Sequence, residues 1–304
     1  MENKQYLSYN GNIIEETELS IGANNRAFQY GDGIFETMFV SGNKVQFFYD
    51  HLDRLIRSMK ILKMEVPVKF TVDTMGLQKE ISKLLNKNKF HKGARVRMTV
   101  FRQSGGFYSP TSNETEYMFQ CSSLESDKFE FNIKGLYVDL YDEIPKPINY
   151  LSRLKTCSSM FFVMAGIYKT ENQLDECILI NTKGNIVEGI SSNIFLVKEN
   201  TIFTPSLREG CLAGIMRQKI IEIARKQSFT VQDEAILKID DLMGADEIFF
   251  TNAINGIRWV MGFKQRRYYN KVSNQLLESL NQMCFPTKFS TEIINPQIQN
   301  YKSA

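Results

Sequence analysis

The sequence predicts a mixed α/β (α+β) protein with two domains. Its 304 residues exceed what one small hydrophobic core organises. Segments with strand-like alternation are interspersed with segments of helical periodicity along the whole chain. The polar stretch CSSLESDKFE interrupts this pattern before the middle. We therefore expect a small N-terminal α/β domain over 1–121, a linker over 122–130, a larger C-terminal domain over 131–285 and a polar tail over 286–304.

Two β-hairpins are expected near the N-terminus. The stretch QYLSYNGNIIEE surrounds Asn10-Gly11, a pair typical of the type I′ turn that joins antiparallel strands. The stretch GIFETMFVSGNKVQFF predicts a second hairpin that turns between Ser41 and Lys44.

Two helices and a strand complete the predicted N-terminal domain. YDHLDRLIRSMKILKM has apolar residues at helical spacing, with Asp50 as a candidate N-cap, and TVDTMGLQKEISKLLNKN is typical of another helix. In ARVRMTVFRQ the residues Val96, Met98 and Val100 alternate with arginines. This alternation predicts a strand with the apolar side chains inward and the arginines outward.

The larger domain is expected to combine a β-meander or barrel-like core with helices. TCSSMFFVMAGIYKTENQ and GIMRQKIIEIARKQS have the composition and spacing of helices. ECILINTKGNIVEGISSNIFLVKENTIFTP is typical of a β-meander, with its first turn at Lys183-Gly184-Asn185. EIFFTNAINGIRWVMGF predicts two short strands around a loop of glycine and asparagine.

Composition excludes several classes of function. The 37 basic and 34 acidic residues give a net charge of +3, which indicates neither nucleic acid nor an anionic membrane as a partner. The chain shows no apolar run of about 18 residues, its N-terminus MENKQYLSYNGNIIEE has no apolar segment typical of a secretory signal, and its five cysteines form no CxxC pair. We therefore expect no secretory signal and a cytoplasmic protein with free thiols. With only two histidines, the chemistry should depend on lysine, tyrosine, carboxylates or a cofactor.

Lys155 is the first candidate catalytic residue, because it precedes the apolar run MFFVMA. Two interpretations are open: an amine at a helix start that reaches solvent, or a partly buried amine whose lowered pKa suits it to Schiff-base chemistry. Glu188 is either a carboxylate at a strand end or the anion that keeps a pyridine nitrogen protonated. Ser191 and Ser192 follow it and offer hydroxyl donors.

Two further features suit a phosphate group. In REGCLAGIMRQKI, Gly214 precedes a predicted helix, whose free N–H groups and dipole favour an anion, although an ordinary helix entry has the same sequence. In HLDRL, His51 and Arg54 share a helix face. Arg54 is either a solvated side chain or a phosphate clamp. A lysine, an acid for a ring nitrogen and two phosphate-binding elements together match what pyridoxal 5'-phosphate requires.

The order and spacing of five motifs resemble the class IV aminotransferase family, the fold-type IV pyridoxal-phosphate enzymes. The motifs are NRAFQYGDGIFET, HLDRL, RLKT, VEGISSNIFLV with the following TP, and GCLAGIMR, and the resemblance spans about residues 5 to 265. The family includes branched-chain aminotransferases, D-amino-acid aminotransferases and 4-amino-4-deoxychorismate lyases.

The resemblance implies a role for each motif residue. Lys155 would hold pyridoxal 5'-phosphate, then release it to an external aldimine with an amino substrate and abstract the α-proton. Glu188 would contact the pyridine nitrogen, while Arg54 and the N–H groups of Ile215 and Met216 would bind the phosphate. The resemblance also implies a cofactor in the cleft between the domains and a homodimer with its active site near the subunit interface.

Departures from the patterns of each subfamily indicate which type of substrate the enzyme would use. Phe35 stands where D-amino-acid aminotransferases have tyrosine, and FRQSGGFYSP lacks their Arg-x-His pair. TCSSMF after the lysine and TNAINGI in the late loop depart from the branched-chain patterns TGGNY and GTA. The lyase branch is similar in FRQSGGFYSP, TNA and GIMRQ, although Ser158 and Trp259 depart from its usual asparagine and proline.

The first expectation is therefore a 4-amino-4-deoxychorismate lyase that releases pyruvate, in the branch that leads to p-aminobenzoate and folate. The alternative is an amino-acid aminotransferase of the branched-chain or D-amino-acid type, and a third is a relative that binds the cofactor without turnover. The expected substrate contacts are spread over several loops: Tyr30, Glu36, Arg102, Asn252 and Ala253.

Overall fold

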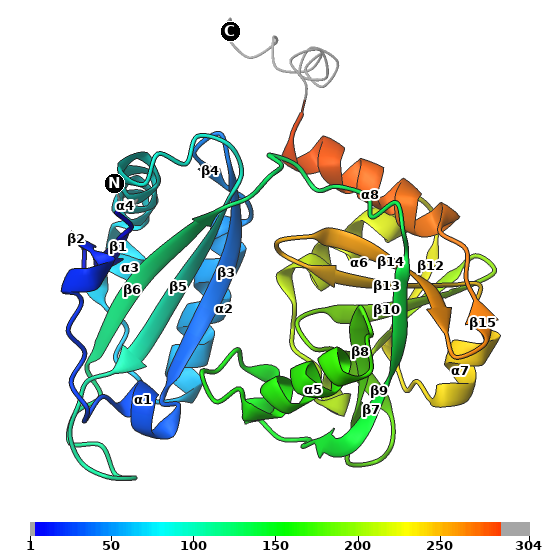
Figure 1. The fold of residues 1–304 in the computed structure, drawn as a ribbon, viewed down its shortest axis with the longest axis horizontal. Coiled ribbons are helices and arrows are strands. Elements are labelled where there is room, and N and C mark those ends of the chain that lie inside the picture. The colour runs from blue at the N-terminus through cyan, green and yellow to red at the C-terminus, as the bar shows by residue number, and fades with distance from the viewer. Residues whose placement is uncertain (1–3, 287–304) are drawn as a thin grey trace, which may run out of the picture.

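Two β-sheets, each packed against helices, form the protein, and the second sheet curls (Figure 1). The computed structural model describes residues 4–286. Apart from its first residue, the tail expected over 286–304 lies outside this range. One sheet is built from residues before 124 and the other from residues after 135. The expected domain boundaries stay a prediction.

The first sheet has six strands in the order β2-β1-β6-β5-β3-β4. Its helices are α1 (Arg26–Tyr30), α2 (Phe48–Ile61), α3 (Val68–Val72) and α4 (Thr74–Lys87). Its strands are β1 (Tyr6–Tyr9), β2 (Asn12–Glu15), β3 (Gly33–Ser41), β4 (Lys44–Val45), β5 (Ala94–Arg102) and β6 (Thr115–Ser123).

Both predicted hairpins are confirmed. Asn10 and Gly11 have positive φ angles of 48° and 91°, as the tight β1–β2 turn requires, and Ser41 pairs with Lys44 in the second hairpin. The predicted N-cap was wrong, because α2 begins at Phe48. Asp50 lies inside its first turn, where it accepts a 3.0 Å hydrogen bond from Lys219 Nζ.

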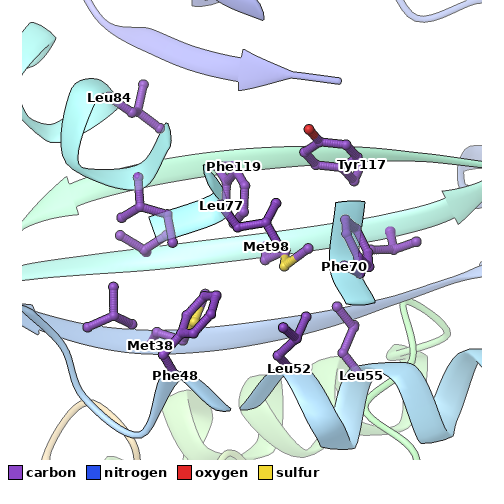
Figure 2. Close-up of a cluster of buried hydrophobic side chains, with 14 of the residues drawn as sticks. Met38, Phe48, Leu52, Leu55, Phe70, Leu77, Leu84, Met98, Tyr117 and Phe119 are labelled. Atoms are coloured by element: carbon purple, nitrogen blue, oxygen red, sulfur yellow. The ribbon is translucent and has the colours of Figure 1, made fainter. Parts of the chain in front are cut away.

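One face of the first sheet carries a hydrophobic core that α2 and α4 cover (Figure 2). Val96, Met98 and Val100 point into it as their alternation predicts, and Phe119 joins them from β6. The opposite face of β3 and β5 lines a cavity together with residues of the second half of the chain, so it lies at the boundary between the two halves.

The second sheet follows the order β12-β11-β10-β13-β14-β7-β8-β9, and β15 pairs with β14. Its helices are α5 (Met160–Glu171), α6 (Ile215–Lys226), α7 (Ile239–Gly244) and α8 (Lys271–Cys284). Its strands are β7 (Leu136–Lys146), β8 (Glu176–Asn181), β9 (Ile186–Gly189), β10 (Asn193–Lys198), β11 (Thr201–Pro205), β12 (Thr230–Ala235), β13 (Glu247–Asn252), β14 (Gly256–Phe263) and β15 (Arg266–Arg267).

The predicted meander is correct for two hairpins and wrong between them. β8 pairs with β9 and β10 pairs with β11, but β13, β14 and β7 separate these hairpins in the sheet. Because the sheet curls, its β9 edge still lies against β10, so the core is barrel-like. A buried apolar cluster under α6 and α8 fills one side of this sheet.

The segment just before α5 is extended at Thr156, where a helix was expected. Helix α5 begins at Met160 instead of Thr156, because Thr156 forms an antiparallel bridge with Ile34 of β3. Within residues 4–286, no helix is long and apolar enough to cross a membrane.

Candidate active site

A cavity of about 420 Å³ lies between the two sheets, within the size range of small-molecule sites. Its walls come from β3 and β5 on one side and from the loops around β9, α6 and β13 on the other. Ten of the predicted site residues line it: Arg54, Lys155, Glu188, Ser191, Ser192, Gly214, Ile215, Met216, Asn252 and Ala253.

Lys155 is held in place by backbone pairing with the first sheet. The Phe35 amide donates to the Lys155 carbonyl over 2.9 Å, and the Cys157 amide donates to the Gly33 carbonyl over 2.8 Å. The amine therefore projects into the cavity, 4.6 Å from the centre of the Phe35 ring. Lys155 is half-buried and lines the cavity.

Burial, and after it the charge of Arg54, lower the pKa of Lys155 from 10.5 to about 8. A pKa near 8 leaves about a tenth of the amines neutral at pH 7. The site thus provides a nucleophilic lysine, and the interpretation of Lys155 as a solvated helix-start residue was wrong because α5 begins five residues later.

Glu188 is a buried carboxylate at the end of β9 with two fixed partners. Its Oε2 accepts from the Leu212 amide over 2.9 Å, and its Oε1 forms an ion pair with Lys146. Lys146 Nζ also donates to the Ser152 carbonyl over 2.9 Å. Sequence reasoning missed Lys146, because nothing near position 146 in the sequence links it to residue 188.

Arg54 is oriented by Glu36, which lies beneath it on β3. Arg54 Nε donates to Glu36 Oε1 over 2.7 Å, and Arg54 Nη1 donates to the Ala213 carbonyl over 2.9 Å. His51 Nδ1 lies 2.7 Å from Glu36 Oε2. Burial alone would raise the pKa of Glu36, but the charge of Arg54 and the hydrogen bonds of both partners lower it to about 2.

The cavity end near Arg54 can hold a dianionic phosphate. Helix α6 begins there with Gly214 as its N-cap and no side-chain cap, so its first N–H groups are free for an anion. A Cβ on Gly214 would lie 1.9 Å from Asn193 Oδ1, so the close approach requires glycine. His51 Nε2 lines the same cavity, buried and without a hydrogen-bond partner among residues 4–286.

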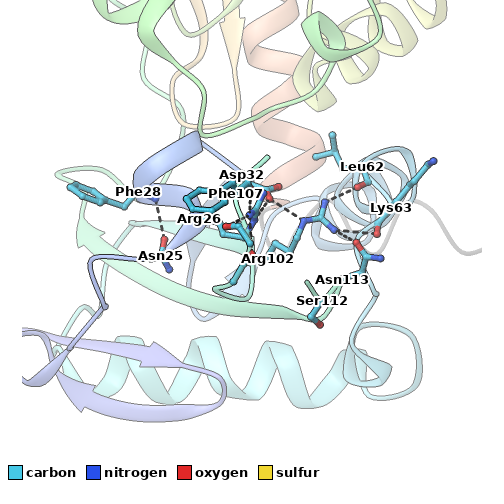
Figure 3. Close-up of polar contacts among 12 residues, drawn as sticks. Asn25, Arg26, Phe28, Asp32, Leu62, Lys63, Arg102, Phe107, Ser112 and Asn113 are labelled. Atoms are coloured by element: carbon cyan, nitrogen blue, oxygen red, sulfur yellow. Dashed lines mark hydrogen bonds and ion pairs between the residues drawn. The ribbon is translucent and has the colours of Figure 1, made fainter. Parts of the chain in front are cut away.

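Three predicted substrate residues lie outside the cavity lining of this chain. Glu36 is on the core face of β3. The Arg102 side chain is held by hydrogen bonds within the first half of the chain (Figure 3): its Nε donates to Asp32 over 3.0 Å and its Nη2 donates to the Leu62 carbonyl over 2.8 Å. The Tyr30 ring lies beside Tyr108, with a centroid separation of 5.6 Å.

Two arginines that were expected to face outward line the cavity instead. Arg95 and Arg97 project from β5 on the face opposite the hydrophobic core. Their direction along the strand was predicted correctly, but at this place residues of the second half of the chain complete a cavity on that face. Within residues 4–286, no cluster of histidine, cysteine, aspartate and glutamate could hold a metal ion.

The two departures from the lyase pattern also lie outside the cavity lining. Trp259 stacks on Phe131 at a centroid distance of 6.3 Å, and its Nε1 donates to the Asn132 carbonyl over 2.6 Å. Ser158 packs closely against Gly31. Trp259 therefore has a packing role, and neither residue is among those that line the cavity.

Proteins of known sequence match most of this chain. A protein from Methanocaldococcus jannaschii, provisionally assigned as a branched-chain-amino-acid aminotransferase, is 27% identical over 92% of this chain and 94% of its own length. An aminodeoxychorismate lyase from Bacillus subtilis is 28% identical over 81% of this chain and 82% of its own length.

A solved structure shows the same fold. The branched-chain amino acid aminotransferase from Thermobaculum terrenum, determined in its PLP-form, matches with a TM-score of 0.81 at 19% identity, over 95% of this chain and 97% of its own. The family model described as amino-transferase class IV matches residues 33–261, which is more than half of the chain. The protein therefore belongs to the amino-transferase class IV family of enzymes.

Proposed function

We propose that the protein is a pyridoxal 5'-phosphate-dependent enzyme in which Lys155 holds the cofactor and moves the substrate proton. The observation that carries the proposal is a lysine with a pKa of about 8 in a cavity that also contains Glu188 and an uncapped helix start. These are a nucleophile, an anion for the ring nitrogen and a phosphate site. The T. terrenum structure in its PLP-form has the same fold.

Each residue then has one task. Arg54 and the N–H groups of Ile215 and Met216 would bind the phosphate. Glu188, which is fixed by Lys146 and the Leu212 amide, would hold a proton at the ring nitrogen. When bound, the cofactor supplies the electron sink for the carbanion that α-proton removal leaves.

Lys155 acts as the general base. Its amine lies within the cavity and would be placed to accept the α-proton of a substrate bound there with the cofactor. A pKa near 8 lies close to working pH, which is where general bases are most effective.

The first candidate reaction is 4-amino-4-deoxychorismate cleavage with release of pyruvate. The late loop TNA brings Asn252 and Ala253 to the cavity wall, as the lyase resemblance requires. Neither Trp259 nor Ser158 intrudes on that wall. The 28% identical relative from B. subtilis is an aminodeoxychorismate lyase.

The second candidate is amino-acid transamination. Phe35, Phe162 and Ile190 line the cavity and would suit an apolar amino acid, and the M. jannaschii relative has been assigned to the branched-chain type.

Spectroscopy of cofactor-loaded protein tests the proposal. We would follow the absorbance of bound cofactor while adding L- and D-amino acids, and assay pyruvate after adding 4-amino-4-deoxychorismate. Pyruvate release with the starting spectrum restored supports the lyase, and conversion to the pyridoxamine form by an amino acid supports the aminotransferase. Lys155→Ala should lose the spectrum of lysine-bound cofactor and nearly all turnover. A Lys155→Ala variant with normal turnover would refute the proposal.

We also propose a homodimer. Phe28, Phe107 and Tyr108 are 81%, 82% and 90% exposed, an unusual grouping of exposed aromatic side chains beside Tyr30. Burial of this group against a second copy would remove it from water. One chain has a mass of 35.2 kDa, and sedimentation should give twice this mass. A monomer at micromolar concentration would contradict the proposal.

A further inference from the structure

Helices α2 and α6 contact each other beside the phosphate end of the cavity. Arg54 of α2 donates from Nη1 to the Ala213 carbonyl over 2.9 Å, two residues before α6 begins at Ile215. Lys219 of α6 donates from Nζ to Asp50 of α2 over 3.0 Å. Asp50 and Arg54 are four residues apart, and so are Ile215 and Lys219. The two contacts are therefore about one helical turn apart on each helix.

These two contacts are the polar side-chain links between the two halves of the chain. Within residues 4–286, every ion pair other than Asp50–Lys219 joins residues that are both before 124 or both after 135. Among the side-chain hydrogen bonds between nitrogen and oxygen in the same range, only Lys219–Asp50 and Arg54–Ala213 connect these two parts. The relative orientation of α2 and α6 thus depends on few polar groups.

The Asp50–Lys219 pair is partly withdrawn from water. The side chain of Lys219 is 14% exposed and that of Asp50 is 33% exposed. The Lys219 ammonium also lies 5.4 Å from the centre of the Phe47 ring, just before α2, and 3.9 Å from Glu222 of its own helix. Ion pairs at a fully exposed surface contribute little, but reduced exposure to water strengthens the attraction. The pair can therefore hold the two helices in one arrangement.

Apolar packing joins the same two parts of the chain without fixing their orientation. Phe39 of β3 packs against Phe129 with a centroid separation of 4.9 Å, and both belong to the buried cluster under α6 and α8. Burial of apolar surface is non-directional. It keeps the two parts together, but it allows α2 to rotate against α6 around the Arg54–Ala213 contact. A second directional contact one turn away restricts that rotation.

A phosphate group bound at this end of the cavity would depend on the orientation of the two helices. The guanidinium group of Arg54 comes from the first half of the chain, whereas the free N–H groups of Ile215 and Met216 come from the second half. A phosphate can accept from both only while the helices keep a fixed separation. Because hydrogen bonds require donor–acceptor distances of about 2.7–3.2 Å, a small shift of either helix removes contacts.

We propose that Asp50 and Lys219 are positioning residues, whose ion pair fixes Arg54 against the start of α6 and thereby sets the affinity of the cavity for the cofactor phosphate. The inference rests on the proposed function, because that function assigns the phosphate of pyridoxal 5'-phosphate to this end of the cavity. Neither residue lines the cavity, so each acts through the helix that carries it. Lys155 is held separately, by its backbone pairing with β3, so capture of an aldehyde by its amine does not depend on the ion pair.

Titration of the full-length apoprotein with two related aldehydes tests the inference. Pyridoxal 5'-phosphate has the phosphate, and pyridoxal has the same ring and aldehyde without it. The variants are Asp50→Asn, Lys219→Gln, the two changes combined, and the exchanged pair Asp50→Lys with Lys219→Glu. The matched control is Asp53→Asn, which removes an exposed ion pair with Arg57 that lies within α2. Thermal unfolding of every variant reports whether it is folded.

Each single variant should bind pyridoxal 5'-phosphate about five- to tenfold more weakly than the wild type, the size of one partly exposed charge-assisted contact. Pyridoxal should bind equally well to all of them, and Asp53→Asn should behave like the wild type. The combined variant should lose no more than either single variant, because both changes remove the same interaction. The exchanged pair should recover most of the lost affinity, and it decides the test if a single variant fails to fold.

Three results would overturn the inference: unchanged affinity for pyridoxal 5'-phosphate in both single variants, an equal loss of affinity for pyridoxal, or an exchanged pair that binds no better than the combined variant. A wild type that binds inorganic phosphate but shows no absorbance change with pyridoxal 5'-phosphate would instead refute only the proposed function. The phosphate affinities of the same variants then decide the inference, and the same loss is expected. A wild type that binds neither compound would refute both.

Discussion

Replacing Glu36 with glutamine removes the charge that organises the phosphate end of the cavity. Glu36 is 2% exposed and receives hydrogen bonds from Arg54 and His51. Glutamine keeps the shape of the side chain. Its amide, however, either turns an N–H group toward the guanidinium or leaves one hydrogen bond unmade, and the charge of Arg54 loses its counterion.

The pKa of Glu36 sets the size of the effect. Its decrease from 4.5 to about 2 in the folded protein corresponds to about 3 kcal/mol of stability at pH 7. Because the folded pKa is the lower one, this contribution is present above pH 4.5 and is lost as the pH falls toward 2. Removal of one partner of a buried ion pair lowers the free energy of unfolding by a comparable amount, about 3–5 kcal/mol.

Urea unfolding at pH 7 and equilibrium binding of pyridoxal 5'-phosphate measure the two consequences. Glu80→Gln is the matched control, because Glu80 is also buried and pairs with Lys69 and Ser8 but lies outside the cavity lining. Both variants should be less stable than the wild type. Only Glu36→Gln should weaken cofactor binding, by about tenfold or more, since Arg54 loses its orientation.

Two results would refute this reasoning. A Glu36→Gln variant with wild-type stability at pH 7 would mean that the buried pair contributes little. Equal cofactor affinity in the Glu36→Gln, Glu80→Gln and wild-type proteins would mean that Arg54 does not need Glu36 to bind the phosphate.

Three further predictions concern the same cavity. With Lys155 at a pKa of about 8, the rate at which apoprotein captures pyridoxal 5'-phosphate should rise with pH up to about 8 and level off above it; a flat stopped-flow profile between pH 6 and 9 would contradict this. Glu188→Gln should retain the cofactor but lower turnover about a hundredfold, the usual order for one lost electrostatic contact at a reacting centre, and unchanged turnover would remove Glu188 from the mechanism. Gly214→Ala should weaken cofactor binding because its Cβ would meet Asn193, whereas Gly166→Ala, with open space around it, should be neutral or stabilise α5 by about 0.5–1 kcal/mol. Thermal unfolding and cofactor titration measure the effect in both variants. Identical behaviour of the two variants would exclude the steric argument.

Local patterns predicted the elements whose structure is decided locally. The Asn10-Gly11 turn, the alternation along β5 and the helical spacing of α6 all hold in the structure. Strand order was not predictable in the same way, because β9 and β10 follow one another in sequence but pair with β8 and β13. Which strands meet is decided by packing between distant segments, which no short window contains.

The alternation of side chains between the two faces of a strand explains why some residues of the candidate site were placed correctly and others were not. Strand alternation assigns Phe35 and Glu36 to opposite faces of β3, but it does not say which face meets the core and which meets the cavity. One face of β3 and β5 packs on the core and the other lines the cavity, so an acid on the core face and arginines on the cavity face contradict the rule that charge points to water. The pairing of His51 and Arg54 on one face of α2 was the feature that could have located Glu36. A guanidinium group and an imidazole one helical turn apart favour a buried anion opposite them, and β3 has a single acidic residue to offer.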